Sequence, residues 1–394
     1  MRARRFAALT VTTAFVLGTA PATAQEATES PAEPTASTPA CPDGNPLPVP
    51  AGPADVARAS ALSASLHEAH RFATGAGVTV AVIDTGVTPH PLLPELVDAG
   101  SFLEPPYSSS GALTDCEGHG TAVASIIGLR TPTDTGSDRE RPVGVAPGVR
   151  IIAIKQSETK NGGTLDSLGH AIDRALDEHA DVINLSVSSC LPNSATLAPG
   201  VLQEAVERAE REGTVIVAAA GNITADCPAD SVSYPAHFPT VIAVSALNTP
   251  ATVAEYSLGL SGKHPVGAPG SITVSASTGG QGYATATDKT EFRGTSFAAP
   301  VVTGFVALLK ERYPRATPTE LRAMVYSSAH PVTGALDVEG SVDKLQGAEP
   351  RARRADTVSP ETPGKTAGWE PLTVLVAVAV AGLMGAAARR PARR

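Results

Sequence analysis

The sequence predicts an α/β domain built on a mostly parallel central β-sheet. Short apolar runs alternate with helical patterns; the runs are residues 151–154, 182–187, 215–220 and 241–244, and the helical patterns are residues 165–178 and 202–212. This alternation predicts right-handed β-α-β crossovers, which pack helices against a parallel sheet. In such a sheet, functional residues belong at the carboxyl ends of the strands.

Length and composition limit the classes of protein that fit. With 394 residues, the chain can bury one large core and still have terminal segments left over. Aromatic residues make up only 4% of the chain, so the core must be built mainly from Val, Ile, Leu and Ala. The formal net charge of −9 argues against nucleic acid as a partner.

The N-terminal segment has the layout of an export signal. Residues 1–24 contain arginines, then an apolar run at 6–20, then small residues before Gln25. This layout predicts a signal peptide with a cleavage site. The alternative is an N-terminal membrane anchor, for which the apolar run is short. Either interpretation predicts an exported chain.

A Pro-rich extension follows at residues 25–54. It lacks a hydrophobic period, so it cannot fold alone. Cys41 within it suggests an extended strap that is tied to the surface of the domain. Apolar residues then recur at helical spacing between residues 55 and 72, which predicts a helix before the first strand.

Three further stretches carry residues suited to catalysis. Residues 78–87 read V-T-V-A-V-I-D-T-G-V, which predicts a buried strand that delivers Asp84. Residues 118–125 read G-H-G-T-A-V-A-S and place His119 before small, helix-compatible residues. Residues 292–309 predict a tight turn into a buried helix, with Ser296 at its start and Pro300 in its first turn. A helix start favours the negative charge that develops when a serine attacks a carbonyl.

Taken singly, these residues have ordinary explanations, namely a strand-end aspartate, a helix histidine and a capping serine. Together, the three motifs in the order Asp, His, Ser resemble the subtilisin (subtilase) family of serine proteases. The resemblance covers residues 74–329 and implies a subtilisin-like three-layer fold. Residues 214–222 read T-V-I-V-A-A-A-G-N and are similar to the segment of this family that presents an asparagine amide to the oxyanion.

The resemblance implies a role for each residue. Ser296 is the nucleophile, His119 takes its proton and later protonates the leaving amine, and Asp84 holds the imidazole. Asn222 and the backbone N–H of Ser296 stabilise the oxyanion. The implied reaction is the hydrolysis of peptide bonds in a protein or peptide substrate.

Two segments are similar to the walls of the family's substrate cleft. The implied substrate-binding residues are Ser186, Val187, Ser188, Ala218, Ala219, Ala220 and Gly221. The first segment departs from the common S-L-G-G pattern, because Ser188 and Ser189 replace the glycines. This departure favours substrates with small or medium side chains.

No metal or cofactor is predicted. The histidines outside the motif lack metal-ligand spacing, and no D-x-D-x-D-G calcium loop is present in the sequence. Residues 85–118 are Pro-rich and predict a surface loop beside the active site, and residues 131–141 predict an exposed loop.

The C-terminal third divides into a domain end, a linker and a membrane anchor. The protease domain is expected to span residues 55–335, with residues 317–328 as its closing helix, and residues 336–370 form a polar linker. Residues 371–388 are apolar and precede the basic tail at 389–394, a pattern that predicts a transmembrane helix with a short cytoplasmic tail. The alternative is a buried helix. A spanning helix would place the protease domain on the extracytoplasmic side of the cell membrane.

A narrower resemblance comes from the parts outside the motifs. An export signal, a Pro-rich extension with a cysteine, a second cysteine before the histidine motif and a C-terminal membrane helix resemble the mycosins, the membrane-anchored subtilases of type VII secretion systems. The stretch I-I-A-I-K-Q-S-E at residues 151–158 is also similar. The resemblance implies a secretion membrane complex as partner. The alternatives are a general cell-surface subtilase that processes envelope proteins and a subtilase-fold scaffold that stabilises a secretion complex.

Four cysteines in an exported chain suggest two disulfides, and three pairings are possible. In the subtilisin fold, the strands before Cys190 and Cys227 are neighbours, so the resemblance favours a bond between these two. Cys41 is then left for Cys116, the pairing that the mycosin resemblance also implies. That bond would tie the extension to the catalytic domain.

Overall fold

The computed structural model describes residues 41, 48–103, 111–131, 141–158, 163–194, 197–198, 200–260, 263–264, 266–287, 292–338 and 341. The strands of its main sheet are β2 (Thr79–Asp84), β3 (Leu96–Ser101), β4 (Arg150–Lys155), β5 (Val182–Leu185), β7 (Val215–Ala219), β9 (Ile242–Thr249), β10 (Thr252–Val253) and β11 (Gly267–Pro269). Their order is β10-β9-β7-β5-β2-β4-β3, with β11 also paired to β9. Every pair runs parallel except β10 with β9, so the predicted mostly parallel sheet is confirmed.

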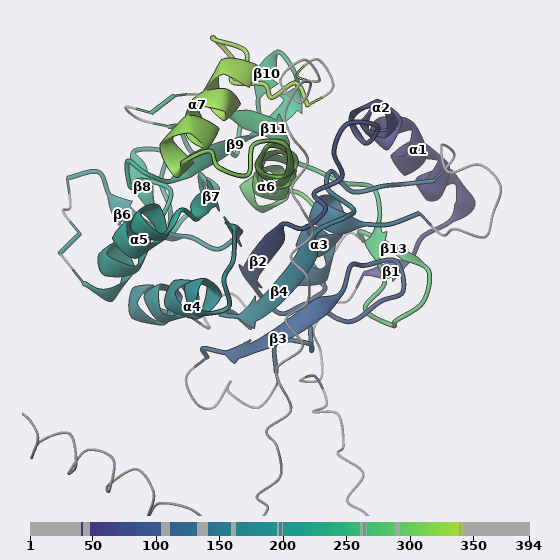
Figure 1. The fold of residues 1–394 in the computed structure, drawn as a ribbon, viewed down its shortest axis with the longest axis horizontal. Helices are drawn as coiled ribbons and strands as arrows, with labels where there is room; N and C mark the ends of the chain where they lie inside the picture. Colours follow the sequence, from purple (N-terminus) through teal and green to yellow (C-terminus); the bar gives the residue numbers. More distant parts are fainter. Residues whose placement is uncertain are drawn as a thin grey trace, which may run out of the picture.

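Helices cover both faces of this sheet. Helices α3 (His119–Gly128) and α6 (Thr295–Arg312) share one core with Val80 and Val82 of β2. Helices α4 (Leu165–Asp177) and α5 (Val201–Glu212) share a second core with Ala81 and Ile83, which point to the opposite face because side chains alternate along a strand. Figure 1 shows α4 and α5 side by side, separated from α6 by the strands. The predicted three-layer arrangement is therefore present.

The helices at the two ends of the domain differ in how well the sequence predicted them. The single helix expected before the first strand is divided into α1 (Pro53–Ser63) and α2 (Leu66–Ala69). The closing helix α7 (Pro318–Ser328) begins where predicted, because Thr317 and Glu320 form a capping box around its first turn. Beyond α7 the chain still pairs with the domain through a β-bridge between Gly267 and Ala335.

The prediction of a surface loop for residues 85–118 is wrong in part. Residues 96–101 form β3, which extends the main sheet beside β4, and Leu93, Ala99 and Ala112 are buried. The prolines on both sides of this stretch indicated a loop, so the strand of six residues was not predicted. Other strands escaped prediction because they have only two to four residues; they are β1 (Val49–Pro50), β6 (Ser189–Pro192), β8 (Ser231–Tyr234), β12 (Ser275–Ala276) and β13 (Tyr283–Thr285).

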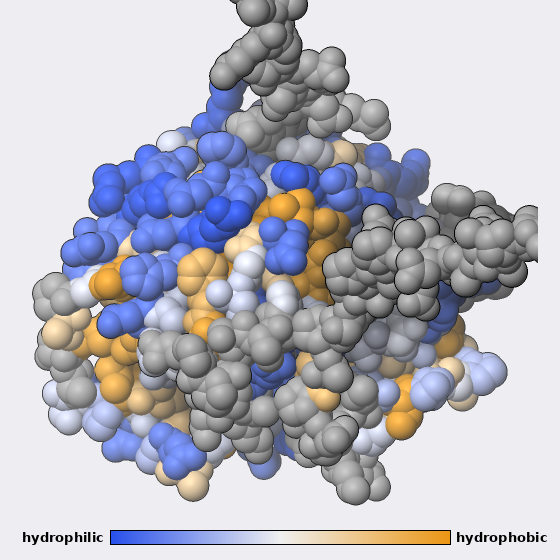
Figure 2. All heavy atoms as spheres, turned by 90° about the horizontal axis from the view of Figure 1, so that it is seen from below, coloured by the Kyte–Doolittle hydropathy of each residue, from blue (hydrophilic) through white to orange (hydrophobic). Residues whose placement is uncertain are grey.

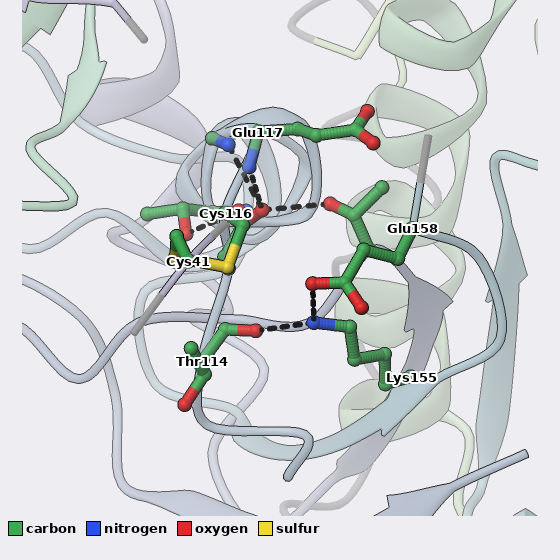
Figure 3. Close-up of a disulfide and its surroundings, with 10 residues drawn as sticks. Cys41, Thr114, Cys116, Glu117, Lys155 and Glu158 are labelled. Atoms are coloured by element: carbon green, nitrogen blue, oxygen red, sulfur yellow. Dashed lines mark hydrogen bonds and ion pairs between the residues drawn. A yellow bond between two sulfur atoms is a disulfide. The ribbon is translucent and has the colours of Figure 1, made fainter. Parts of the chain in front are cut away.

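Two disulfides fix segments that lie beside the main sheet, with the pairing expected from the sequence. Cys190 of β6 is bonded to Cys227, which precedes the antiparallel partner strand β8. Cys41 is bonded to Cys116, close to the start of α3 (Figure 3). Further along the extension, β1 pairs with β13. The extension is therefore held to the domain by both a covalent bond and a strand pairing.

Several predicted segments lie outside the described residues. These are the signal peptide at 1–24, most of the extension and of the loop at 131–141, and the apolar segment at 371–388 with its basic tail. Within the part of the chain that is described, no helix has the length and apolar character needed to cross a bilayer. The face shown in Figure 2 carries mainly hydrophilic side chains with apolar patches among them.

Candidate active site

The aspartate at the end of β2 and the histidine at the start of α3 are in direct contact. Asp84 is fully buried, and its Oδ1 lies 2.7 Å from His119 Nδ1. The backbone N–H of Thr85 also donates to this oxygen, at 2.8 Å. An ionised carboxylate can only accept hydrogen bonds, so Nδ1 carries the proton and Nε2 of the neutral imidazole is an acceptor. This is the tautomer that a general base requires.

A glycine permits this close contact. A Cβ atom on Gly120 would lie 2.0 Å from the carbonyl oxygen of Gly86 and 3.1 Å from Cβ of Asp84. Any larger residue would therefore push the first turn of α3 away from the end of β2. The G-H-G pattern thus places His119 where it can reach Asp84.

The serine is the second residue of α6, as the motif predicted, but the position assigned to Pro300 is wrong. Pro300 lies in the second turn, where it lacks the N–H that would bond to the carbonyl of Ser296. The hydroxyl of Ser186 replaces that donor, with Oγ 2.8 Å from the Ser296 carbonyl oxygen. Ser186 in turn accepts from the side chain of Asn184 at 2.9 Å, and Asn184 accepts from Thr303 at 2.8 Å. A chain of neutral hydrogen bonds therefore joins β5 to the start of α6.

The amide of Asn222 is oriented by α6. Its Oδ1 accepts from the backbone N–H of Thr295 at 3.0 Å and from the Thr295 hydroxyl at 3.1 Å. Because a backbone N–H can only donate, the amide oxygen must face Thr295 and Nδ2 must point the other way. Nδ2 is thereby available as a donor beside Gly294 and Ser296.

These groups surround one cleft of about 470 Å³. Its lining residues are Thr85, Glu117, His119, Gln156, Ser157, Gly163, Thr164, Leu165, Leu168, Ser186, Val187, Ser188, Ser189, Asn222, Arg293, Ser296 and Phe297. Among the described contacts, Ser296 Oγ makes no hydrogen bond to the imidazole, although both residues line the cleft. Catalytic hydrogen bonds are often long before substrate binds.

The predicted substrate-binding residues divide into two groups. Ser186, Val187 and Ser188 line the cleft. Residues 218–221 do not line it; Ala218 and Ala219 belong to β7, and all three alanines of this segment are buried. The sequence assigned no role in the site to Gln156, Ser157 or Arg293. Gln156 and Ser157 lie in the stretch that is similar to mycosins, but that resemblance did not imply that they line the cleft.

The histidine is held in an acidic environment. Burial lowers the pKa of His119, but the charge of Asp84, its hydrogen bond, and the charges of Asp115 and Glu117 together raise it to about 9. The side chain is 26% exposed, so these charges are only partly screened by water. The neutral form of His119 therefore predominates only in alkaline solution.

No metal chemistry is indicated by the described side chains. Across the described ranges, no group of three or more His, Cys, Asp or Glu residues is arranged to hold a metal ion. The arrangement of carboxylate, imidazole, hydroxyl and amide is suited to nucleophilic attack on a carbonyl.

Comparison with known proteins identifies the family. The model of the subtilase family, a peptidase family, matches residues 75–354. The chain belongs to the subtilase family. It is a serine endopeptidase, in agreement with its relatives. Mycosin-1 of Mycobacterium tuberculosis is 33% identical over 315 residues, which cover 70% of this chain and 68% of the relative. Subtilisin DY of Bacillus licheniformis is 33% identical over 255 residues, covering 65% and 84%.

Solved structures give the same family. The crystal structure of MycP1 with the N-terminal propeptide removed aligns with a TM-score of 0.63 and 29% identity, covering 72% of this chain and 96% of that one. A chain in the structure of an intact ESX-5 inner membrane complex aligns with a TM-score of 0.62 and 27% identity, covering 88% and 94%. The subtilase is thus similar to mycosins in both sequence and fold.

Proposed function

We propose that Asp84, His119 and Ser296 form the catalytic triad of this serine endopeptidase. The observation that carries the proposal is the 2.7 Å contact between Asp84 and His119 at the edge of the cleft that Ser296 also lines. Ser296 Oγ attacks the scissile carbonyl while His119 Nε2 accepts its proton. The leaving amine then takes that proton, and water hydrolyses the acyl-enzyme by the same route.

The developing oxyanion has two donors at hand in this proposal. The first is Asn222 Nδ2, which points away from Thr295. The second is the backbone N–H of Ser296, which has no partner within the helix because Ser296 is the second residue of α6. Both would act on charge that is present only in the transition state and the tetrahedral intermediate. The positive end of the α6 dipole adds to this stabilisation.

We further propose a membrane-anchored mycosin that acts in type VII protein secretion. The similarity to a chain of an ESX-5 inner membrane complex supports this role. In this proposal residues 1–24 direct export, residues 55–335 form the protease domain outside the cytoplasmic membrane, and residues 371–388 span the membrane. The implied partners are a protein or peptide substrate and the secretion membrane complex.

The test of the triad is the variant Ser296→Ala, which removes one oxygen at the surface of the cleft. We expect it to abolish hydrolysis of a peptide panel while the circular dichroism spectrum and melting temperature remain those of the wild type. Hydrolysis by the purified variant at the wild-type rate would contradict the assignment.

A scaffold that stabilises the secretion complex is a second candidate function, favoured by the same similarity to an assembled complex. Strains that carry Ser296→Ala or a deletion of the whole chain separate the two. Secretion that fails in both strains indicates proteolysis, whereas secretion that fails only in the deletion indicates a structural role.

A further inference from the structure

A buried carboxylate connects the two elements that carry Asp84 and His119. Asp115 is 3% exposed and precedes α3. Its Oδ1 accepts from the hydroxyl of Thr85 at 2.8 Å, and from the backbone N–H groups of Glu117 and Gly118 at 3.1 and 2.9 Å. Its Oδ2 accepts from the backbone and the hydroxyl of Thr121, at 2.7 and 2.6 Å. Five donors converge on one carboxylate.

Thr85 extends this network from the strand to the helix. It follows Asp84 directly, and its Oγ1 accepts from the backbone N–H of Gly120 at 3.0 Å while donating to Asp115. The same hydroxyl therefore contacts the residue after His119 and the carboxylate that holds the first turn of α3. A displacement of Asp115 would therefore shift both Asp84, through Thr85, and His119, through the first turn of α3.

The segment that bears Asp115 is also fixed from outside the network. Lys155 Nζ donates to the carbonyl oxygen of Thr114 at 2.9 Å and pairs with Glu158 at 3.1 Å (Figure 3). Cys116, the next residue after Asp115, carries the disulfide to Cys41. The segment is thus held by a buried ion pair on one side and a covalent bond on the other.

We propose that Asp115, acting through Thr85 and Thr121, is a positioning residue that sets the geometry of Asp84 relative to His119. The proposal rests on the proposed function of the triad. Small errors in the placement of reacting groups cost large factors in rate, which gives a reason for so many hydrogen bonds at one carboxylate. Asp115 itself does not line the cleft and would not touch the substrate.

Two pairs of variants test the positioning role. Thr85→Val removes the bridging hydroxyl without changing charge, and Thr85→Ser restores it. Asp115→Asn removes the charge and turns one acceptor into a donor that faces N–H groups. Asp98→Asn is the matched control, because Asp98 also accepts from a nearby backbone N–H, that of Gly100, but is exposed and has no described hydrogen bond to the site.

On the alkaline plateau of the pH–rate profile, we expect Thr85→Val and Asp115→Asn to lower kcat by about tenfold or more with little change in KM. Thr85→Ser and Asp98→Asn should keep kcat within about twofold of the wild type. Asp115→Asn should also shift the acid limb of the pH–rate profile to lower pH, since it removes a negative charge near His119. Wild-type kcat and pH profile in Thr85→Val and Asp115→Asn, with only a lower melting temperature, would overturn the proposal.

Proton NMR can test the positioning role of Asp115 without any peptide hydrolysis, and so independently of the proposed triad. The proton on His119 Nδ1 that bonds to Asp84 should give a far-downfield proton NMR signal in the full-length protein. We expect this signal in the wild type and in Thr85→Ser, and its loss or shift in Thr85→Val and Asp115→Asn, whether or not the protein hydrolyses peptides. An unchanged signal in all variants would contradict the positioning role.

Arg293 is the cleft residue best placed to influence substrate choice. Arg293 lines the cleft and is exposed, and its guanidinium carbon lies 4.4 Å above the centroid of the Tyr256 ring. The carbonyl of Gly270 accepts from both the Tyr256 hydroxyl and the backbone N–H of Gly294, at 3.1 and 2.8 Å. The aromatic support is therefore tied to the turn that leads into Ser296.

Arg293 carries a permanent positive charge in a cleft that is also lined by His119 and the carboxylate of Glu117. It is the single Lys or Arg among the cleft-lining residues, and no ion pair to it occurs in the ranges that the structure describes. We infer that Arg293 binds a carboxylate of the substrate. The protease would then prefer a substrate with an acidic side chain at a position that lies near Gly294 when the scissile bond is at Ser296. Stacking on Tyr256 limits the guanidinium to few orientations, which favours such a contact.

Peptides that carry Glu, Gln or Lys at each position around one cleaved bond test this inference. We expect the wild type to prefer Glu over Lys at one position by about two- to fivefold, the size of an exposed ion pair, with the preference declining at high salt. Arg293→Gln should abolish the preference and Arg293→Glu should reverse it, whereas Arg150→Gln, at the start of β4, should retain it.

Binding separates this inference from the triad proposal. If no peptide is cleaved, fluorescence anisotropy with the Ser296→Ala protein and labelled Glu and Lys peptides measures the same preference. An equal preference in wild type and Arg293→Glu, in cleavage or in binding, would refute the role of Arg293.

Discussion

The two halves of the site are held by different forces. The half that carries Asp84 and His119 is organised by buried charge, because Asp115 accepts five hydrogen bonds. The half that carries Ser296 is organised by neutral groups, in the chain Thr303, Asn184, Ser186 and in the pair Asn222 and Thr295.

This difference matches the charge that each half would handle in the proposed mechanism. Negative charge near His119 favours an imidazolium, the form created when the base accepts a proton. Negative charge near the oxyanion would oppose the transition state, so neutral donors suit the serine half. The predictions below separate the two halves, beginning with the largest expected effect.

In the neutral half of the site, truncation of Asn222 should cause the largest loss of activity. We expect Asn222→Ala to lower kcat by about 10²–10³-fold with a nearly unchanged KM, since the amide acts on charge present only in the transition state. Steady-state kinetics on a peptide substrate measure this split. An effect confined to KM would contradict the role of the amide.

The charged half should make activity depend on pH. Because the pKa of His119 is raised to about 9, this residue is mostly protonated at neutral pH and cannot then act as the proposed base. We expect kcat/KM to rise by up to about tenfold per pH unit from pH 7 and to level off near pH 9. A limb centred on the ordinary histidine value of about 6.5 would show that the charges around His119 are screened.

The same group should affect stability in the opposite direction. The folded state binds the His119 proton more tightly than the unfolded state does. The Asp84–His119 pair therefore makes its full contribution to the free energy of unfolding below pH 6.5, and this contribution is lost as pH rises through about 9. Chemical denaturation of the wild type and of His119→Gln at pH 6 and pH 9 measures this linkage. The difference between the two proteins should be smaller at pH 9.

Two disulfides lie beside different parts of the cleft, one next to Asp115 and one next to Ser188 and Ser189, and their effects should be separable. Cys41–Cys116 closes a separation of 75 residues and Cys190–Cys227 one of 37. In the chain-entropy model each contributes about 4 kcal/mol to the free energy of unfolding. Serine replacement of the first pair should lower kcat through the segment next to Asp115, and replacement of the second should act on KM, because Cys190 follows Ser188 and Ser189 in the cleft wall.

Peptide mapping without reduction checks the pairing itself. Fragments that join Cys41 to Cys190 or to Cys227, or alkylation of all four cysteines in the native protein, would contradict the two bonds.

The sequence predicted the parts of the fold that recur with a period or a motif. The apolar runs of β2, β4, β5 and β7 are long enough to show burial on both faces, and the motifs around Asp84, His119 and Ser296 are contiguous in the chain. Contacts between residues that are far apart in the chain produce no period or motif in the sequence. Asp115 and Thr85 are 30 residues apart, and Ser186 and the Ser296 carbonyl are 110 residues apart.

The error at Pro300 shows why such contacts escape sequence reasoning. A proline was expected in the first turn, where its missing N–H costs little. In the second turn it leaves the carbonyl of Ser296 without a helical donor, and the donor that replaces it comes from another strand. Only the three-dimensional arrangement shows that Ser186 serves the helix rather than the substrate alone.

The smallest expected effect concerns this replacement donor. Ser186→Ala removes the partner of the buried Asn184 amide and of the partly buried Ser296 carbonyl, and we expect it to lower the free energy of unfolding by about 1–3 kcal/mol. Ser188→Ala, an exposed neighbour in the same wall, should change it by less than about 0.5 kcal/mol. Urea denaturation of both variants measures the difference. Because Ser186 positions the first turn of α6, its variant should also lower kcat. If the two variants were equally stable, the neutral chain from β5 would not hold the serine half of the site.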